Sequence, residues 1–473
     1  MVAGCAVGPT YRPPADATLG VPPAYTAAAP AGQASDLPHW WTSFNDPLLN
    51  GIIDTALKQN LDIEQAVARL RQARESYVQT RASLFPSVSA TSGYSRNFSL
   101  RGQTFGSITN AGITNQTVSI GADASYQLDI FGGNRRASEA AKRNYESSGF
   151  SLARVQASVA SEVARSYILA RAAQASVSIA QGSVAIQNEN FEIAGYRAQA
   201  GLVSSLDAEQ ARAQRAQTAA QVPTLQQQFE QASDTLGVLT GQAPGALRAQ
   251  LIAAAPIPKG PDAVPAGIPG DIIRLRPDVR SAERTLAAAT ANIGVAQAQL
   301  YPQFSIGGSV SSNANTVSTL TDIVTGRVFA NIAQTIFDAG KSKSVVRARR
   351  AAAEQAFAAY KSTVLTALQD VENGLVALHT AQARQQELTT AVDAATNAAQ
   401  LARVQYRAGL TDITTLNNAE AQLLSAQSSL IGARSDEAQA LVQLYLALGG
   451  GWDAAGPIPT AEPLRRGDGQ PGH

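Results

Sequence analysis

One stretch of the chain decides the fold: residues 118–130, which read Val-Ser-Ile-Gly-Ala-Asp-Ala-Ser-Tyr-Gln-Leu-Asp-Ile. Apolar and polar residues alternate strictly along it, and both carboxylates, Asp123 and Asp129, fall in the polar set. Because successive side chains of a strand point to opposite faces, this period of two predicts a strand with one apolar and one polar face. Its length of about 13 residues exceeds the usual five or six, and about 9–11 are enough to cross a membrane. The stretch therefore predicts a membrane-spanning strand.

The residues before this strand predict its surroundings. Residues 87–98 form a weaker partner strand, and a long loop rich in Gly and Thr joins the two. Upstream, a helical pattern begins at Asp46-Pro47, where proline suits the first helical turn, and restarts after Asn60. It ends at Phe85-Pro86, because proline cannot continue a helix.

The same pattern occurs twice in the chain. Ala298–Phe304 resembles Ala82–Val88, and the Tyr-Arg and Gly-Leu pairs near Gly201 return near Gly409. The matching segments lie roughly 200 residues apart, which indicates a duplicated domain rather than a short repeat. Each copy is predicted to contain a helix, a strand pair, a very long helix, a glycine turn and a further helix.

The very long helices set the length of the molecule. From about Ser138 to Gln199 there is no proline, and apolar residues such as Val163, Ala170 and Val177 recur every seven positions. This is the coiled-coil period. About 60 residues at about 1.5 Å each give roughly 90 Å, so these helices must form a bundle or the wall of a tube.

Composition and charge exclude several classes of protein. Charged residues make up 15% of the 473 residues, where roughly 25% is usual, and aromatic residues 6%. The formal net charge is +1 and no long basic run occurs, so nucleic acid is not an expected partner. The sequence contains no apolar run of about 18 or more residues, so no transmembrane helix is predicted.

The predicted strands cannot close a barrel within one chain. In lipid, an open sheet edge leaves backbone groups without partners, at a cost of several kcal/mol each. The smallest membrane barrels have about eight strands, so four strands per chain require at least two chains, and three chains would supply twelve. The predicted fold class is therefore an α+β membrane protein, with a shared β-barrel continued by a long α-helical coiled-coil barrel.

These observations divide the chain into five segments. They are an extended N-terminal lead at 1–46, a first repeat at 47–252, a linker rich in Pro, Ala and Gly at 253–270, a second repeat at 271–452, and a disordered tail at 453–473.

Several short motifs resemble the lipidated outer-membrane factors of RND-type efflux systems, the TolC/OprM/NodT group. The motifs are Gly4–Pro13, Trp40-Trp41 with Phe44–Pro47, Arg276–Arg280, Gly294–Ala296, Tyr301-Pro302 and Ala447–Trp452. The resemblance implies a homotrimer with a 12-stranded barrel in the bacterial outer membrane and a helical barrel that extends into the periplasm. It also implies a passive exit duct for small molecules, a periplasmic adaptor, an inner-membrane transporter of the RND type and contact with outer-membrane lipid.

The lone cysteine, Cys5, is the expected lipidation site. Its context, Ala3-Gly4-Cys5, resembles the end of a lipobox, although the basic and apolar parts of a signal peptide are missing from the sequence. A single cysteine also excludes an internal disulfide framework and any metal site with several cysteines.

No arrangement of residues predicts catalysis, a metal site or a cofactor. The histidines, His39, His379 and His473, are scattered, and the sequence contains no phosphate-binding loop. We therefore predict that the protein is not an enzyme.

Two glycine turns are the expected contact with a partner. Glycine permits the positive φ that ends a helix, and the leucine after each, in Gly201-Leu202 and Gly409-Leu410, must be covered by something. The alternative is that each leucine packs against its own hairpin. In the family that the chain resembles, these turns form the periplasmic tip that docks the adaptor.

The same resemblance places a gate at the tip, formed by Asp207, Tyr406, Asp412 and Asn418. The sequence departs from the family pattern there. Thr411 stands where the family has an arginine partner for Asp207, and Asn418 replaces a carboxylate. We therefore expect a gate held by packing and by neutral hydrogen bonds from Tyr406.

Cations follow both corners where a strand leads into a long helix. They are Arg135, Arg136, Lys142 and Arg143 at the first corner, and Lys341, Lys343, Arg347, Arg349 and Arg350 at the second. Either these are solvated helix starts, or they reach lipid phosphates at the inner rim of the membrane.

Two alternative functions remain at this point. The same duct could serve type I protein secretion instead of small-molecule efflux. Alternatively, the chain could be a coiled-coil periplasmic adaptor or scaffold, although the two hairpins and the long alternating strands favour a duct.

Overall fold

The protein is described by a computed structural model, which covers residues 6–27, 36–97, 115–454 and 456. The first half of the chain contains α1 Asp16–Leu19, η1 Leu37–Phe44, α2 Pro47–Gln59, α3 Leu61–Ala82, β1 Ser87–Asn97, β2 Asn115–Leu128, α4 Gly133–Gln199, α5 Ser205–Leu239 and α6 Arg248–Leu251. The second half contains η2 Pro269–Asp271, α7 Ile272–Leu275, α8 Pro277–Ala298, β3 Gln303–Ala314, η3 Val317–Thr319, β4 Thr325–Ala333, α9 Lys341–Arg407 and α10 Ile413–Ala447.

The two halves contain the same main elements at the same lengths. Helices α3 and α8 each have 22 residues, α4 and α9 each have 67, and α5 and α10 each have 35. The predicted strand at 118–130 is confirmed as β2, and the weaker strand at 87–98 as β1. The predicted end of the helical pattern before Pro86 is confirmed as well, since α3 ends at Ala82.

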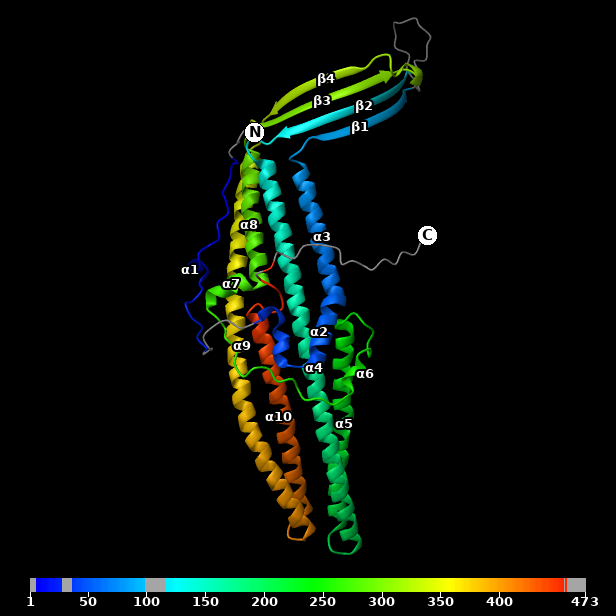
Figure 1. The fold of residues 1–473 in the computed structure, drawn as a ribbon, viewed down its shortest axis with the longest axis vertical. Coiled ribbons are helices and arrows are strands. Elements are labelled where there is room, and N and C mark those ends of the chain that lie inside the picture. Colours follow the sequence, from blue (N-terminus) through cyan, green and yellow to red (C-terminus); the bar gives the residue numbers. More distant parts are fainter. Residues whose placement is uncertain (1–5, 28–35, 98–114, 455, 457–473) are drawn as a thin grey trace. The chain divides into compact units, whose positions relative to one another are not determined.

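The chain forms two compact units, and each takes segments from both halves. The first unit comprises Met1–Pro13, Arg71–Ser147 and Ala282–Tyr360, and the second comprises the remaining segments. The first unit contains a four-stranded antiparallel sheet in the order β1-β2-β3-β4 (Figure 1). The strands β1 and β4 are therefore the two edges of the sheet within one chain.

The strand register gathers most of the large apolar residues of the four strands on one face of the sheet, with Phe329 on the other face as an exception. Val118 lies opposite Tyr94 and Tyr126 opposite Ile306, while Phe304 lies opposite both Leu128 and Ile332. The other face carries residues such as Asp123, which is opposite Ser89 and Ser309. A slip of one residue would exchange the two faces, so the pairing defines which face is apolar. Many of the apolar side chains are exposed in the single chain, Val328 at 91% and Ile332 at 70%.

The start of the N-terminal lead packs into the first unit. The Val7 amide donates to the Phe131 carbonyl at 3.1 Å, and the Arg136 guanidinium donates to the carbonyls of Val7 and Gly8 at 3.2 and 3.3 Å. Gly8 has a φ of +97°, and a Cβ at that position would lie 2.4 Å from the Gly294 Cα. Glycine is therefore needed here for both conformation and space.

The second unit has its aromatic core around η1. The lead is not extended throughout, because η1 buries Trp40, Trp41 and Phe44 and stacks Trp40 on Tyr445 with 5.5 Å between ring centroids. Burial of such large side chains stabilises a helical turn that has no periodicity in the sequence. Below η1 the long helices pair as two hairpins, α4 with α5 and α9 with α10 (Figure 1).

Among the described residues, no helix combines the length and the hydropathy that crossing a bilayer requires.

Candidate functional site

The two glycine turns have the same backbone geometry. Gly201 has a φ of +70° and Gly409 a φ of +74°, which confirms the predicted left-handed residue at each helix end. The Leu202 amide donates to the Arg197 carbonyl at 2.9 Å, and the Leu410 amide donates to the Gln405 carbonyl at 2.8 Å. Each turn is a Schellman motif, in which a bond spanning six residues satisfies a carbonyl at the end of the helix.

The leucines after the glycines are exposed in the single chain. In a Schellman motif the residue after the glycine commonly packs against the third or fourth residue from the helix end, and the fourth residues here are Tyr196 and Val404. Tyr196 and Val404 are themselves 69% and 66% exposed, so neither covers its leucine. Leu202 is 69% exposed and Leu410 is 78% exposed. The two leucines are therefore available to a partner at two equivalent positions.

Each turn ends at a capped helix. The Ser204 hydroxyl accepts from the Leu206 amide at 3.2 Å at the start of α5, and the Asp412 carboxylate accepts from the Thr415 amide at 2.7 Å at the start of α10. The hydrogen bond from Thr415 lowers the pKa of Asp412. Asp412 therefore keeps its negative charge to lower pH than an ordinary aspartate.

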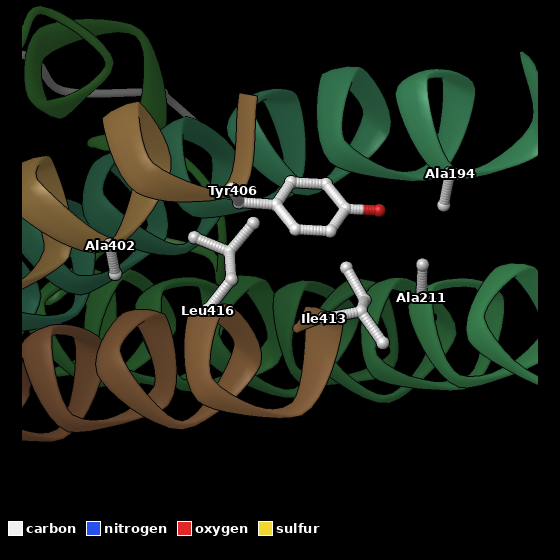
Figure 2. Close-up of a cluster of buried hydrophobic side chains, with 6 residues drawn as sticks. All are labelled: Ala194, Ala211, Ala402, Tyr406, Ile413 and Leu416. Carbon is white, nitrogen blue, oxygen red and sulfur yellow. The ribbon is translucent and has the colours of Figure 1, made fainter. Parts of the chain in front are cut away.

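A tip cluster joins the two hairpins just above their turns. It consists of Ala194, Ala211, Ala402, Tyr406, Ile413 and Leu416, all buried (Figure 2). The Tyr406 ring lies among small residues of the first hairpin and Ile413 of the second. Burial of a side chain such as Ile413 or Leu416 contributes about 1.5–3 kcal/mol, so the cluster holds the hairpins together within one chain.

Polar contacts between the hairpins surround the tip cluster. The Arg197 guanidinium donates to the Tyr406 carbonyl at 2.7 Å and lies over its ring, 4.9 Å from the centroid. On the surface, Arg407 pairs with Glu189 at 3.3 Å, and the Thr414 hydroxyl contacts the Gln210 side chain at 3.4 Å. Arg197 thus ties the end of α4 to the end of α9.

The residues predicted for the gate have different environments in the single chain. Asp207 is half-buried on α5, while Asp412 and Asn418 are exposed on α10. Within the described chain, Asp207 forms no ion pair. The Tyr406 hydroxyl is buried and has no hydrogen-bond partner among the described residues, so the hydrogen bonds expected from it are not formed within one chain. Burial raises the pKa of Tyr406, and the nearby Arg197 charge opposes that rise.

A buried ion pair at the second hairpin was missed by the sequence analysis. The Arg403 guanidinium donates to both carboxylate oxygens of Glu420, whose side chain is only 2% exposed. The two residues lie on opposite sides of the turn at Gly409. Pairing opposite charges across a predicted hairpin turn would have been the signal that identifies them.

Two further expectations concern lipidation and metals. Cys5, the expected lipidation site, lies outside the described residues. In the described part of the chain, no group of three or more His, Cys, Asp and Glu side chains could hold a metal ion.

Comparison with known proteins identifies the class. A model of the family described as outer membrane efflux protein matches residues 52–242 and 268–450. The toluene efflux pump outer membrane protein TtgC of Pseudomonas putida is 33% identical over 473 residues, covering 96% of this chain and 94% of the relative. The pyoverdine export outer membrane protein OpmQ of Pseudomonas putida is 31% identical over 449 residues, covering 94% and 95%. The solved outer-membrane channel OprN superposes with a TM-score of 0.85 at 33% identity, covering 95% of this chain and 100% of that one.

The two-faced sheet and the paired hairpins are those of an outer-membrane channel subunit. The chain belongs to the outer membrane efflux protein family, and it is an outer-membrane channel component of an efflux system. This membership excludes the alternative of a coiled-coil adaptor or scaffold.

Proposed function

We propose that three copies of the chain close a 12-stranded barrel and form a passive exit duct that carries small molecules across the periplasm and the outer membrane. One observation carries this proposal. The register places most of the large apolar side chains of four strands on one face, and it leaves β1 and β4 as open edges. Edges in lipid must pair with other copies, and a barrel of twelve strands is wide enough for a water-filled interior. The duct has no catalytic role.

The duct works with two partners, a periplasmic adaptor and an inner-membrane transporter of the RND type. The exposure of Leu202 and Leu410 supports adaptor docking at the hairpin tips. Relatives named for toluene efflux and pyoverdine export favour small-molecule cargo over the alternative of protein secretion. Acylation of Cys5 anchors the lead, and the hydrogen bonds of Arg136 to Val7 and Gly8 support an anchor held beside the sheet.

Native mass spectrometry of the protein purified from outer membranes tests assembly and anchoring together. Expressed with a complete signal peptide before Cys5, the protein should run as three chains, each carrying a mass increase from acyl groups at the mature N-terminus. A monomer or dimer that still conducts ions would overturn closure by three copies. Three chains with an unmodified Cys5 would overturn the lipid anchor and leave the duct in place.

The gate at the tip is the narrowest part of the proposed duct. Asn418 is exposed in the single chain and is not part of the tip cluster, so its amide is available to the interior of the tube. Asp207 and Asp412 supply the remaining carboxylates there. We expect milder cation selectivity than in a duct ringed by additional carboxylates, because a neutral amide does not concentrate cations.

Changing Asn418→Asp should increase cation selectivity and block by divalent cations in planar-bilayer recordings. The change adds one negative charge per chain at a narrow position, where field lines are focused by low-dielectric walls. Gln59→Glu, exposed at the end of α2, is a control that adds the same charge away from the hairpin turns (Figure 1). Unchanged selectivity in Asn418→Asp would show that position 418 does not line the constriction.

A further inference from the structure

The two corners where a strand leads into a long helix differ in how many of their cations form ion pairs. At the β2–α4 corner, Arg135 pairs with Asp129 at 3.2 Å and Arg136 pairs with Glu139 at 2.8 Å. Arg143 likewise pairs with a carboxylate, Glu146, at 2.9 Å. The first corner therefore neutralises most of its positive charge with its own carboxylates.

The β4–α9 corner leaves its cations without carboxylate partners. Its five basic residues are all exposed, and in the described part of the chain none of them forms an ion pair; they are Lys341, Lys343, Arg347, Arg349 and Arg350. Two carboxylates lie close to these cations in the sequence. Glu354 follows Arg350 by four residues on α9, and the pair is not within ion-pair distance in the described chain. Asp338 accepts hydrogen bonds from the amides of Gly340 and Ser342 at 3.0 and 2.8 Å. Asp338 therefore caps the first turn of α9.

The spacing and position of these cations make the corner a strongly positive surface. Lys343, Arg347 and Arg350 follow one another at intervals of four and three, so they share one face of α9. Lys341 and Lys343 lie in the first turn of α9 and oppose its dipole, and all five cations repel one another unless an anion covers them. A bound anion would remove both the mutual repulsion of the cations and their conflict with the helix dipole.

Two large apolar side chains precede the cations. Ile336 is 97% exposed and Phe337 is 87% exposed, and both lie between the end of β4 at Ala333 and Asp338. They continue the chain beyond Ile332, which lies on the apolar face of the sheet. Apolar residues next to a group of Lys and Arg are typical of segments that lie in the interface between acyl chains and lipid headgroups.

In the proposed barrel β4 pairs with β1 of a neighbouring copy, so the end of that copy's α3, which leads into β1, lies beside this corner. This end of α3 has an exposed outer face, where Arg71, Arg74 and Arg81 outnumber Glu75. The neighbouring copy would therefore add positive charge rather than neutralise it. The charge favours an anionic partner, and the apolar pair favours one with acyl chains.

We propose that the β4–α9 corner, consisting of Ile336, Phe337 and the five cations, binds anionic phospholipids of the outer membrane. The cations contact the headgroup phosphates, and Ile336 and Phe337 lie against the acyl chains. This inference rests on the proposed duct, because it requires that β4 end at the inner surface of the bilayer. Each Lys or Arg near an anionic membrane surface strengthens binding several-fold, so five of them give a clear preference over zwitterionic lipid.

Lipid binding to the detergent-purified full-length assembly tests the proposal. Phosphatidylglycerol and phosphatidylcholine are titrated separately, and bound lipid is counted by native mass spectrometry. The wild-type protein should bind phosphatidylglycerol at least tenfold more tightly than phosphatidylcholine. Changing all five cations to glutamine should remove this preference, and a milder variant, K343Q/R347Q/R350Q, should lose most of it if the full set impairs assembly.

A matched control carries the same change of charge at other exposed positions, all in the second unit. It replaces with glutamine Lys58, Arg69, Arg154, Arg165 and Arg434. The control should keep the preference for phosphatidylglycerol. Loss of the preference in the control, its persistence in the corner variant, or complete displacement of the lipid by free inorganic phosphate would each overturn the proposal.

Channel recordings separate this inference from the duct on which it rests. A wild-type protein that conducts in planar bilayers but shows no lipid preference would overturn the lipid site alone. A wild-type protein that assembles no conducting channel would overturn the proposed duct itself.

Discussion

Export should be abolished when both Leu202 and Leu410 are changed to serine, while assembly of the channel stays intact. Both leucines are exposed in the single chain, so their removal costs the isolated fold little. Burial of one leucine on docking is worth about 1.5–3 kcal/mol, which is roughly a tenfold to hundredfold change in affinity per site. The two sites in each chain are repeated around the assembly, so the combined loss should exceed what docking can tolerate.

Dye efflux in a host that lacks its own outer-membrane duct measures this effect, and native gel electrophoresis measures assembly. Leu206→Ser is the matched control. Leu206 is also exposed on the tip, at 61%, but the equivalent position of the second hairpin is the polar Thr414. Leu206 is therefore not part of a repeated pair of docking leucines. The control should export at nearly the wild-type level. If the double variant fails to assemble, the leucines stabilise the hairpins themselves and the docking proposal is wrong.

The second large effect is expected at the buried ion pair of the second hairpin. Changing Arg403→Ala leaves the Glu420 carboxylate buried without its counter-charge, because that side chain is only 2% exposed. Removing one partner of a buried pair destabilises by about 3–5 kcal/mol. The end of α9 and the start of α10 should therefore open far more often, with amide hydrogen exchange faster by about 100-fold or more.

Arg407→Ala is the matched control for this experiment. Arg407 is four residues further along the same helix and also pairs with a glutamate, but its side chain is 58% exposed and that of Glu189 is 65% exposed. Exposed pairs contribute about 0–1 kcal/mol, so exchange should change little. The double variant Arg403→Met with Glu420→Leu should restore much of the protection, since an apolar pair can replace a buried ion pair. Equal effects of Arg403→Ala and Arg407→Ala would contradict the role assigned to burial.

The elements of this protein could be predicted from its sequence because they follow from local periods. Alternation over residues 118–130 predicted β2, and a stretch of more than 60 residues without proline predicted α4. Gly201 and Gly409 predicted the turns, because a left-handed residue is a property of the local backbone. The cap at Asp412 is equally local, since its partner Thr415 is three residues away, although the family resemblance predicted only a gate role for Asp412.

The tertiary structure alone decided which side chains distant in the sequence meet. Arg136 and Arg143 pair with glutamates three residues further along α4, which is a local contact, but Arg136 also donates to the carbonyl of Val7 in the N-terminal lead. Likewise, no local pattern places Arg197 against Tyr406, or leaves the Tyr406 hydroxyl buried without a partner. The period of apolar residues in the sequence determines which side chains share one face of a helix or strand. Which groups those faces meet depends on the register between elements distant in the chain, and that register is set by packing of the whole fold.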